Sequence, residues 1–322
     1  IYCNIPAARN ISNIGGRAQK GKIAVKLAKH TYVKKEPIYM NTVLTVFTPT
    51  YNRKEKLGSV YSSLIDQTDK DFIWMIVDDG SDDGTRDAVQ GWIAENRIRI
   101  TYYTKENGGK HTAYNLAVDN CATDYMFVAL DSDDFMPRDA VSEINGLLRS
   151  NPGCCGIVGL AVCDNGRKPD DIEKFNMRSM YDVLSTYDFS AETGLVIRTE
   201  YLKKFKYPVI EGEKFFTEAY TYYQMTEPFI WTNKVFRTST YCSDGLTKNI
   251  YRLYAANPKS FYMYQKMRSE ITVNFKKKLK SVISADAFYI MSGQSEKKSA
   301  LARLFMPLGF LYYKYIMHKN RT

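Results

Sequence analysis

The sequence predicts an α/β fold: a Rossmann-like, mostly parallel sheet flanked by helices, followed by a helical C-terminal region. Two observations predict it. From Val43 onward, short apolar runs alternate with segments of helical periodicity, as in βαβ units. The apolar runs are nearly continuous, which is typical of strands that helices cover on both faces. With 322 residues and 44% apolar content, the chain can bury a sizeable core.

The predicted elements alternate regularly up to Pro137 and less regularly beyond it. Strands are predicted at 43–48, 72–77, 98–104, 125–130, 157–162, 195–198 and 229–238. Helices are predicted at 54–67, 83–95, 110–121 and 215–225, and again from about 248 to the end. We expect Asp82 or Asp83 to cap the second of these helices, and Pro49 to end the first strand.

The net charge of +10 is concentrated at the two ends of the chain. Residues 1–39 contain eight Lys/Arg and one Glu, and residues 297–322 contain six Lys/Arg and no acid. The body between them is mildly acidic, which argues against a nucleic-acid partner, because a nucleic-acid cleft would make the folded body basic. The basic ends suit an anionic membrane surface, or they are solvated charge runs.

Cysteine usage indicates a reducing compartment. The six cysteines form neither a matched pair of C-x-x-C zinc motifs nor a disulfide framework, and no apolar signal-peptide core opens the chain. We therefore expect reduced thiols and a cytoplasmic location, at the inner face of the cell membrane if the basic ends bind lipid.

Polar residues follow each of the first two strands. The first strand leads into Thr48-Pro49-Thr50-Tyr51-Asn52-Arg53, where Tyr51 can present a flat ring to a planar base, although a turn after a strand is ordinary. The second strand ends in Asp78 and Asp79, adjacent carboxylates that repel each other and need compensation. Accepting a hydrogen bond from a pyrimidine N–H is one such role. The Gly, Ser and Asp residues that follow need only form a turn and a helix cap.

The third strand is followed by Asn107-Gly108-Gly109-Lys110-His111. The glycine pair permits close backbone approach, or simply a turn. Cationic residues at a helix start oppose the helix dipole, but they suit an end that receives an anion such as a diphosphate. Lys110 is therefore a candidate phosphate-side cation.

The strongest motif is Leu130-Asp131-Ser132-Asp133-Asp134, directly after an apolar strand. Unpaired carboxylates beside a core are costly, and a hard divalent cation, Mn²⁺ or Mg²⁺, would resolve the cost. An acidic turn that faces water is the alternative. The motif has no His or Cys nearby, which argues against zinc. All four motifs are expected at the same edge of the sheet, where such folds bind ligands.

With these motifs in this order, the sequence resembles family 2 glycosyltransferases of the GT-A (nucleotide-diphospho-sugar transferase) fold. The resemblance rests on TPTYNR at 48–53, DDGSDDGT at 78–85, NGGKHTAYN at 107–115 and LDSDD at 130–134. The later segments EGEKFFTEAY at 211–220 and YCSDGLTKN at 241–249 are similar to the branch that builds bacterial capsular and other cell-surface polysaccharides.

The resemblance implies a role for each motif. Pro49 and Tyr51 would flank the uracil of a UDP-sugar, and Asp79 would accept from that base. Lys110 would lie near the nucleotide diphosphate. Asp131 would hold the ribose or metal-bound water, and Asp133 would coordinate a catalytic Mn²⁺ or Mg²⁺ ion, so that both aspartates are candidate metal ligands.

The resemblance also implies an inverting reaction in which a carboxylate deprotonates the acceptor hydroxyl. Many relatives place this base in a Glu-Asp pair at a helix start, whereas this chain has Thr217-Glu218-Ala219. Glu218 is the expected base and Glu213 the reserve, although a dipole-stabilised helix carboxylate would also explain Glu218. The Gln-x-x-Arg-Trp pattern of processive relatives is absent, so we expect one sugar per encounter.

Three regions follow from this interpretation. Residues 1–39 are a basic extension, either a native arm or an upstream translation before a natural start at Met40, and they do not enter the fold prediction. Residues 40–245 are the predicted catalytic domain, with a nucleotide-binding half at 40–140 and an acceptor and sugar half at 141–245. Residues 246–322 form the helical C-terminal region.

The C-terminal segment 301–317 is apolar and aromatic, with Arg303 and Lys314 inside it. Its longest uncharged stretch is too short to span a bilayer, which takes about 20 apolar residues. We expect it to lie in the membrane interface, where it would meet a lipid-linked saccharide acceptor, or else to pack on the catalytic domain.

Two other functions remain open from the sequence alone. A nucleotidyltransferase would also use a nucleotide and a metal, but it should carry a Gly-rich loop after the first strand, which 48–53 lacks. A non-catalytic nucleotide-sugar-binding protein would keep Asp131 and Asp133 without a working base.

Overall fold

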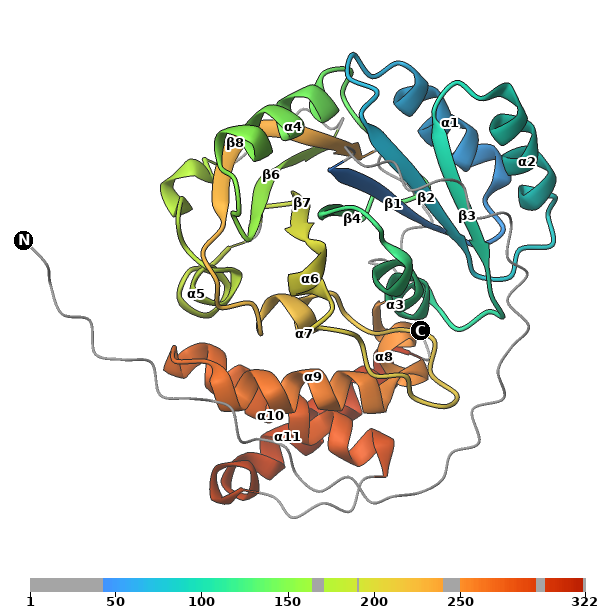
Figure 1. The fold of residues 1–322 in the computed structure, drawn as a ribbon. Helices are drawn as coiled ribbons and strands as arrows, with labels where there is room; N and C mark the ends of the chain where they lie inside the picture. The colour runs from blue at the N-terminus through green and yellow to red at the C-terminus, as the bar shows by residue number, and fades with distance from the viewer. Residues whose placement is uncertain (1–42, 164–170, 190, 240–249, 294–298, 321–322) are drawn as a thin grey trace, which may run out of the picture.

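An eight-stranded mixed sheet organises the molecule, with the strand order β3-β2-β1-β4-β7-β6-β8-β5 (Figure 1). The computed structural model describes residues 43–163, 171–189, 191–239, 250–293 and 299–320. The predicted extension at 1–39 and the motif at 241–249 lie outside these residues. The strands are β1 (Leu44–Thr50), β2 (Phe72–Asp78), β3 (Arg99–Thr104), β4 (Tyr125–Val128), β5 (Asp134–Phe135), β6 (Gly156–Cys163), β7 (Thr193–Arg198) and β8 (Ile230–Ser239).

The first half of the sheet is parallel, as predicted. β1 lies between β2 and β4, and β2 also pairs with β3, all in parallel. The connecting helices are α1 (Lys54–Ile65), α2 (Thr85–Glu95) and α3 (Lys110–Asn120). Helix α2 begins at Thr85 with Gly84 at the N-cap position, which is not the predicted Asp82 or Asp83. Asp83 nevertheless accepts from the Thr85 N–H at 3.0 Å, at the start of this helix.

Strand β1 also runs through Pro49 to Thr50, which corrects the prediction that Pro49 ends it. The ladder between β1 and β4 extends only to Val46. The Phe47 carbonyl, two residues before Pro49, faces the β4 side and accepts from Leu130. The nitrogen of Pro49 therefore faces β4 beyond the last paired residue of β1 and β4. The N–H that proline lacks is not needed for a hydrogen bond between these strands.

The second half of the sheet is mixed, because β7 runs antiparallel to both β4 and β6. Its helices are α4 (Ala140–Ser150), α5 (Met180–Thr186), α6 (Thr199–Leu202) and α7 (Ala219–Tyr222), together with a 3₁₀ turn at Glu173–Phe175. The predicted helix at 215–225 is thus reduced to the four residues of α7. Its apolar and aromatic residues satisfied a helical pattern because they are core residues of an irregular segment, with Phe216, Tyr223 and Met225 all buried.

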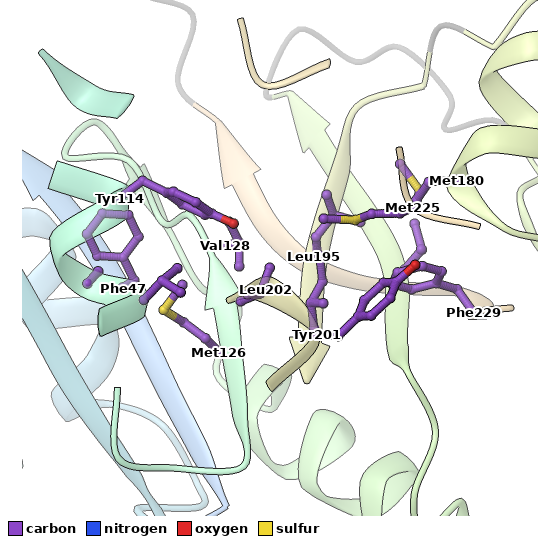
Figure 2. Close-up of a cluster of buried hydrophobic side chains, with 14 of the residues drawn as sticks. Phe47, Tyr114, Met126, Val128, Met180, Leu195, Tyr201, Leu202, Met225 and Phe229 are labelled. Atoms are coloured by element: carbon purple, nitrogen blue, oxygen red, sulfur yellow. The ribbon is translucent and has the colours of Figure 1, made fainter. Parts of the chain in front are cut away.

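Helices cover both faces of the sheet (Figure 1). Residues alternate along β2: Phe72, Trp74 and Ile76 pack in the cluster that includes α1, α2 and α4. Met75 and Val77 face the other way, into the cluster that includes α3. This second cluster continues from β1 and α3 across β4 and β7 to Met225 and Phe229 (Figure 2). One core therefore joins the two halves of the sheet, which fixes the geometry of any site between them.

Four helices follow the sheet: α8 (Ile250–Ala256), α9 (Pro258–Ile271), α10 (Phe275–Ser292) and α11 (Ala300–Lys319). They have a core of their own, in which Phe261 stacks on Phe288. In Figure 1 they form a layer beside α3 and α7. Within the described residues, no helix combines the length and apolar character that crossing a membrane requires.

Candidate active site

The four sequence motifs meet at one edge of the sheet. Each follows the carboxyl end of a strand, after β1, β2, β3 and β4 in turn, and these four strands are adjacent and parallel. The prediction that the motifs share one edge is therefore confirmed. An open cavity of about 710 Å³ lies at this edge, between the turn after β2 and the end of β3, with Asp78 and Lys105 in its lining. A cavity of similar size lies at the opposite ends of β1 and β4, away from the motifs.

The two adjacent carboxylates after β2 are compensated by the protein itself. Asp78 accepts from the Tyr102 hydroxyl at 2.6 Å and from the Ser81 N–H at 2.8 Å. Asp79 accepts from the N–H groups of Gly108 and Gly109, at 3.0 and 2.6 Å, and pairs with Lys105. Their burial thus needs no ligand. Asp79 instead ties the turn after β2 to the loop that begins α3, and its role toward a base stays a prediction.

Gly109 has to be glycine for two reasons. Its φ of +93° is a backbone conformation that favours glycine. A Cβ at this position would lie 1.8 Å from the carbonyl oxygen of Lys214. The glycine therefore lets the segment before α7 close over the start of α3, which brings a segment of the mixed half against the parallel half.

Lys110, the first residue of α3, forms ion pairs with residues from both halves of the sheet. Its ammonium lies 2.7 Å from Asp131 and 2.6 Å from Glu218. Burial alone would lower the pKa of Lys110, but the two carboxylates outweigh it and raise that pKa above its usual value. The structure thus brings together three residues that the sequence assigned separately to the phosphate side, the metal and the base.

Asp133 has a cation of its own. The Arg53 guanidinium donates to it at 2.7 Å, from the loop between β1 and α1. At Asp131, burial would raise the pKa of the carboxyl, but Lys110, Arg237 and Arg53 together lower it below its usual value. Asp131 is therefore ionised at neutral pH, and both aspartates present carboxyl oxygens to the edge of the sheet.

Asp134 does not join the other two aspartates of its motif but contacts Arg237, a residue that the sequence analysis missed. It pairs with Arg237 of β8 at 3.0 Å, and both side chains are largely buried. Burial raises the pKa of Asp134 to about 6. Arg237 lies inside β8, where no sequence motif surrounds it. The sequence could have indicated it only as a charged residue within a predicted strand.

Glu218 lies directly before α7 and its side chain is about half exposed. The reserve candidate Glu213 is instead buried and occupied. Its carboxylate accepts from the backbone N–H groups of Lys259 and Ser260, both at 2.8 Å, and from the Ser260 hydroxyl at 2.6 Å. Glu213 therefore caps the start of α9, whereas Glu218 is the more exposed of the two carboxylates and is paired with Lys110.

Tyrosines that the sequence analysis did not single out surround Glu218. Burial, reinforced by the Glu218 charge, raises the pKa values of Tyr114, Tyr207 and Tyr222. The buried Tyr114 hydroxyl has no hydrogen-bond partner within the described part of the chain, and it lies close to Val128 at the end of β4 (Figure 2). Tyr114 lies within the NGGKHTAYN motif, and its place in that motif is the sequence feature that could have identified it.

At the end of β1, Tyr51 and Pro49 differ in access. The Tyr51 ring is 49% exposed, whereas Pro49 is buried in the strand. Tyr51 is therefore the ring that this edge offers for stacking on a planar group.

The oxygen donors fit a hard divalent cation only if a ligand completes the site. Among the described residues, no three His, Cys, Asp or Glu side chains converge as a complete protein metal site would require. Asp131 and Asp133 nevertheless offer carboxylates, and Mg²⁺ and Mn²⁺ are commonly held by one or two carboxylates together with substrate phosphates. These two residues would hold the metal, and a diphosphate would supply the remaining oxygens.

The fold is that of GT-A glycosyltransferases. The structure of residues 1–349 of TarS from S. aureus, in complex with UDP-GlcNAc, superposes with a TM-score of 0.55 at 16% identity, covering 87% of this chain and 91% of that one. The mannosyltransferase PcManGT from Pyrobaculum calidifontis, in complex with GDP-Man and Mn²⁺, gives 0.53 at 17% identity, covering 89% and 90%.

The chain belongs to glycosyl transferase family 2, whose sequence model matches residues 45–205, and it is thus a member of a family of transferase enzymes. The putative teichuronic acid biosynthesis glycosyltransferase TuaG of Bacillus subtilis is 34% identical over 102 residues, which are 31% of this chain and 40% of TuaG. The matches to the first relatives therefore span less than half of those proteins. A Campylobacter jejuni protein, the GalNAc(5)-diNAcBac-PP-undecaprenol beta-1,3-glucosyltransferase, matches at 24% identity over 79% of this chain and 84% of its own length.

Proposed function

We propose that the chain is an inverting, metal-dependent glycosyltransferase that moves a sugar from a nucleotide-diphosphate sugar, with UDP as the nucleotide, to a hydroxyl of a saccharide. The observation that carries the proposal is the position of Lys110 between Asp131 and Glu218, at 2.7 and 2.6 Å. It brings a carboxylate suited to act as a base next to the carboxylates suited to a diphosphate and its metal. Donor and acceptor chemistry need this proximity, because the bond broken and the bond formed share one carbon.

In the proposed reaction, Glu218 takes the proton of the acceptor hydroxyl while the hydroxyl oxygen attacks the anomeric carbon of the sugar. The new C–O bond forms opposite the departing nucleotide diphosphate, so the anomeric configuration inverts. The proton ends on Glu218 and the negative charge on the diphosphate. A divalent cation held by Asp131 and Asp133 would neutralise that charge.

Lys110 has a second part in this proposal. In this structure the Glu218 carboxylate is held by the Lys110 ammonium at 2.6 Å. An incoming diphosphate competes for the Lys110 ammonium, and its binding frees Glu218 to accept a proton. Base activity is then coupled to the presence of the donor.

The proposed acceptor is a lipid-linked saccharide, and the proposed process is the synthesis of a bacterial surface polysaccharide. The relatives support this by name: TuaG is assigned to teichuronic acid, the Rhizobium meliloti ExoW to succinoglycan, and the Campylobacter jejuni protein to a diphospho-undecaprenol saccharide. Such an acceptor requires the enzyme to work at a membrane surface, through peripheral contact of the C-terminal region.

The test is a transfer assay with the full chain, Mn²⁺, a panel of UDP-sugars and undecaprenyl-diphosphate-linked saccharides. UDP release with a product one sugar heavier, and with an inverted anomeric linkage by NMR, is the expected result. Glu218→Gln should still bind UDP but release it from the donor about a thousandfold more slowly. UDP binding without transfer to any acceptor would instead favour a non-catalytic nucleotide-sugar-binding protein.

A further inference from the structure

Helix α11 carries a stripe of exposed apolar side chains along one face. Leu304, Leu308, Leu311 and Tyr315 are 71%, 46%, 61% and 45% exposed. Their spacing of four, three and four residues places them on a single side of the helix. We call these four residues the α11 stripe. Such a contiguous row of large exposed apolar groups marks a surface that another body covers.

The opposite face of α11 is fixed to the rest of the protein, so the stripe cannot turn inward. Gly309 and Ile316 are buried, and a Cβ on Gly309 would lie 2.3 Å from the Cβ of Asp286 in α10. At the far end, Tyr315 of the stripe itself also packs on the protein, with its ring 5.6 Å from that of Tyr251 in α8. The helix is therefore held by its buried face and at Tyr315, and the three leucines of the stripe are presented outward on a rigid support.

The charges around the stripe identify its partner. Arg303 and Lys314 are exposed and border it along one side, at a helical spacing that keeps them together. The described residues of α8 to α11 and their connections contain eleven Lys/Arg but only two acids, Glu270 and Asp286, and Asp286 is buried. An apolar stripe with basic borders complements an anionic lipid surface, where acyl chains take the apolar groups and headgroups the cations.

We infer that the α11 stripe docks the protein on an anionic membrane surface, with Leu304, Leu308 and Leu311 inserted at the level of the headgroup and acyl boundary. The purpose of the docking rests on the proposed function, because a lipid-linked acceptor is confined to that surface. The docking itself does not depend on catalysis and is measured separately.

The experiment is co-sedimentation of the full chain with vesicles of phosphatidylcholine alone and of phosphatidylcholine with phosphatidylglycerol. The wild type should bind the anionic vesicles, and less so as salt rises. The double variant Leu304→Gln/Leu311→Gln should lower the partition coefficient by roughly tenfold or more, because binding scales with the apolar area inserted. The matched control is Met177→Gln/Val209→Gln, which changes residues of similar exposure, 63% and 69%, elsewhere on the surface and should bind as the wild type does.

The basic border has its own test. Arg303→Gln/Lys314→Gln should weaken binding to anionic vesicles by about fivefold per charge removed and leave binding to neutral vesicles unchanged. Equal weakening on both vesicle types would contradict an electrostatic role for the border.

Two outcomes would overturn the inference. One is vesicle binding that Leu304→Gln/Leu311→Gln leaves intact. The other is self-association without vesicles, seen by sedimentation velocity and abolished by the same double variant, which would make the stripe a contact between copies of the chain. Calorimetry of UDP binding, run in parallel, distinguishes failure of this inference from failure of the proposed function. A protein that binds UDP but not vesicles would contradict only the docking surface. A protein that binds vesicles but not UDP would contradict only the donor site.

Discussion

The two halves of the sheet position their chemistry in different ways. In the parallel half, Asp79, Lys110, Asp131 and Asp133 all lie within a few residues of a strand end, and parallel strands bring their carboxyl ends to one edge. In the mixed half, Glu218 precedes a helix of four residues, and Arg237 lies inside β8. Topology alone therefore places the first set, whereas tertiary contacts place the second.

The difference shows what holds Glu218 in the site. Its ion pair with Lys110 and the closure of the chain over Gly109 connect it to the parallel half, together with nearby contacts such as the packing of Tyr207 against Tyr114 of α3. The proposed catalytic geometry thus depends on a junction between the two halves rather than on either alone. The predictions that follow test this junction, starting with the largest effect.

Glu218→Gln should lower kcat by about a thousandfold, since a general base contributes on the order of 10²–10⁴. UDP affinity should change little, which a parallel binding measurement checks. Glu213→Gln is the matched control, because this carboxylate caps α9 instead. It should cost about 1 kcal/mol of unfolding free energy and leave kcat nearly unchanged. Equal kcat losses in the two variants would contradict the assignment of the base.

Gly109→Ala should destabilise the protein by about 3 kcal/mol, because it combines a positive φ with a Cβ placed 1.8 Å from the Lys214 carbonyl oxygen. Urea denaturation followed by circular dichroism measures it. Gly91→Ala serves as the control: a Cβ in the middle of α2 meets no atom within 4 Å, and alanine should stabilise that helix by about 0.5–1 kcal/mol. If Gly109→Ala is as stable as Gly91→Ala, the two halves do not close as described.

His111, next to the junction, should make stability fall with acid. Burial lowers the pKa of His111 to about 4, so the folded chain keeps the imidazole neutral where the unfolded chain protonates it, from about pH 6.5 downward. This contribution is complete above pH 6.5 and is lost as pH falls toward 4. Between pH 7 and 4.5 it amounts to about 2 kcal/mol.

His111→Gln cannot be protonated and should show a correspondingly smaller loss of stability over that range. Urea denaturation of both proteins at pH 7 and 4.5 provides the comparison. An identical pH dependence would mean that the imidazole is accessible to water in the folded state.

The sequence predicts the parallel half and its motifs well, because the periodicity of a strand and the carboxylates at its end can be recognised locally. The parallel topology then places all these strand ends at one edge of the sheet. Three features could not be predicted this way. The compensation of Asp78 by Tyr102 joins residues on adjacent strands, and the Asp134–Arg237 pair depends on β8 returning beside β5. The segment around α7 has a helical apolar pattern but folds irregularly, because its aromatic residues fill the core between the halves. In each case the deciding contact is remote in sequence.

The central claim is that the strand-end motifs form a metal-dependent nucleotide-diphosphate site, and calorimetry of UDP binding tests it most directly. Wild type, Asp133→Asn and the control Asp82→Asn would be titrated with UDP in Mn²⁺ and in EDTA. Asp82 is an exposed carboxylate at the same edge, outside the proposed metal ligands. The account predicts binding that EDTA weakens, that Asp133→Asn weakens by tenfold or more, about 1.4 kcal/mol, and that Asp82→Asn leaves unchanged. Metal-independent binding that Asp133→Asn retains, or no binding by the folded wild type, would contradict it.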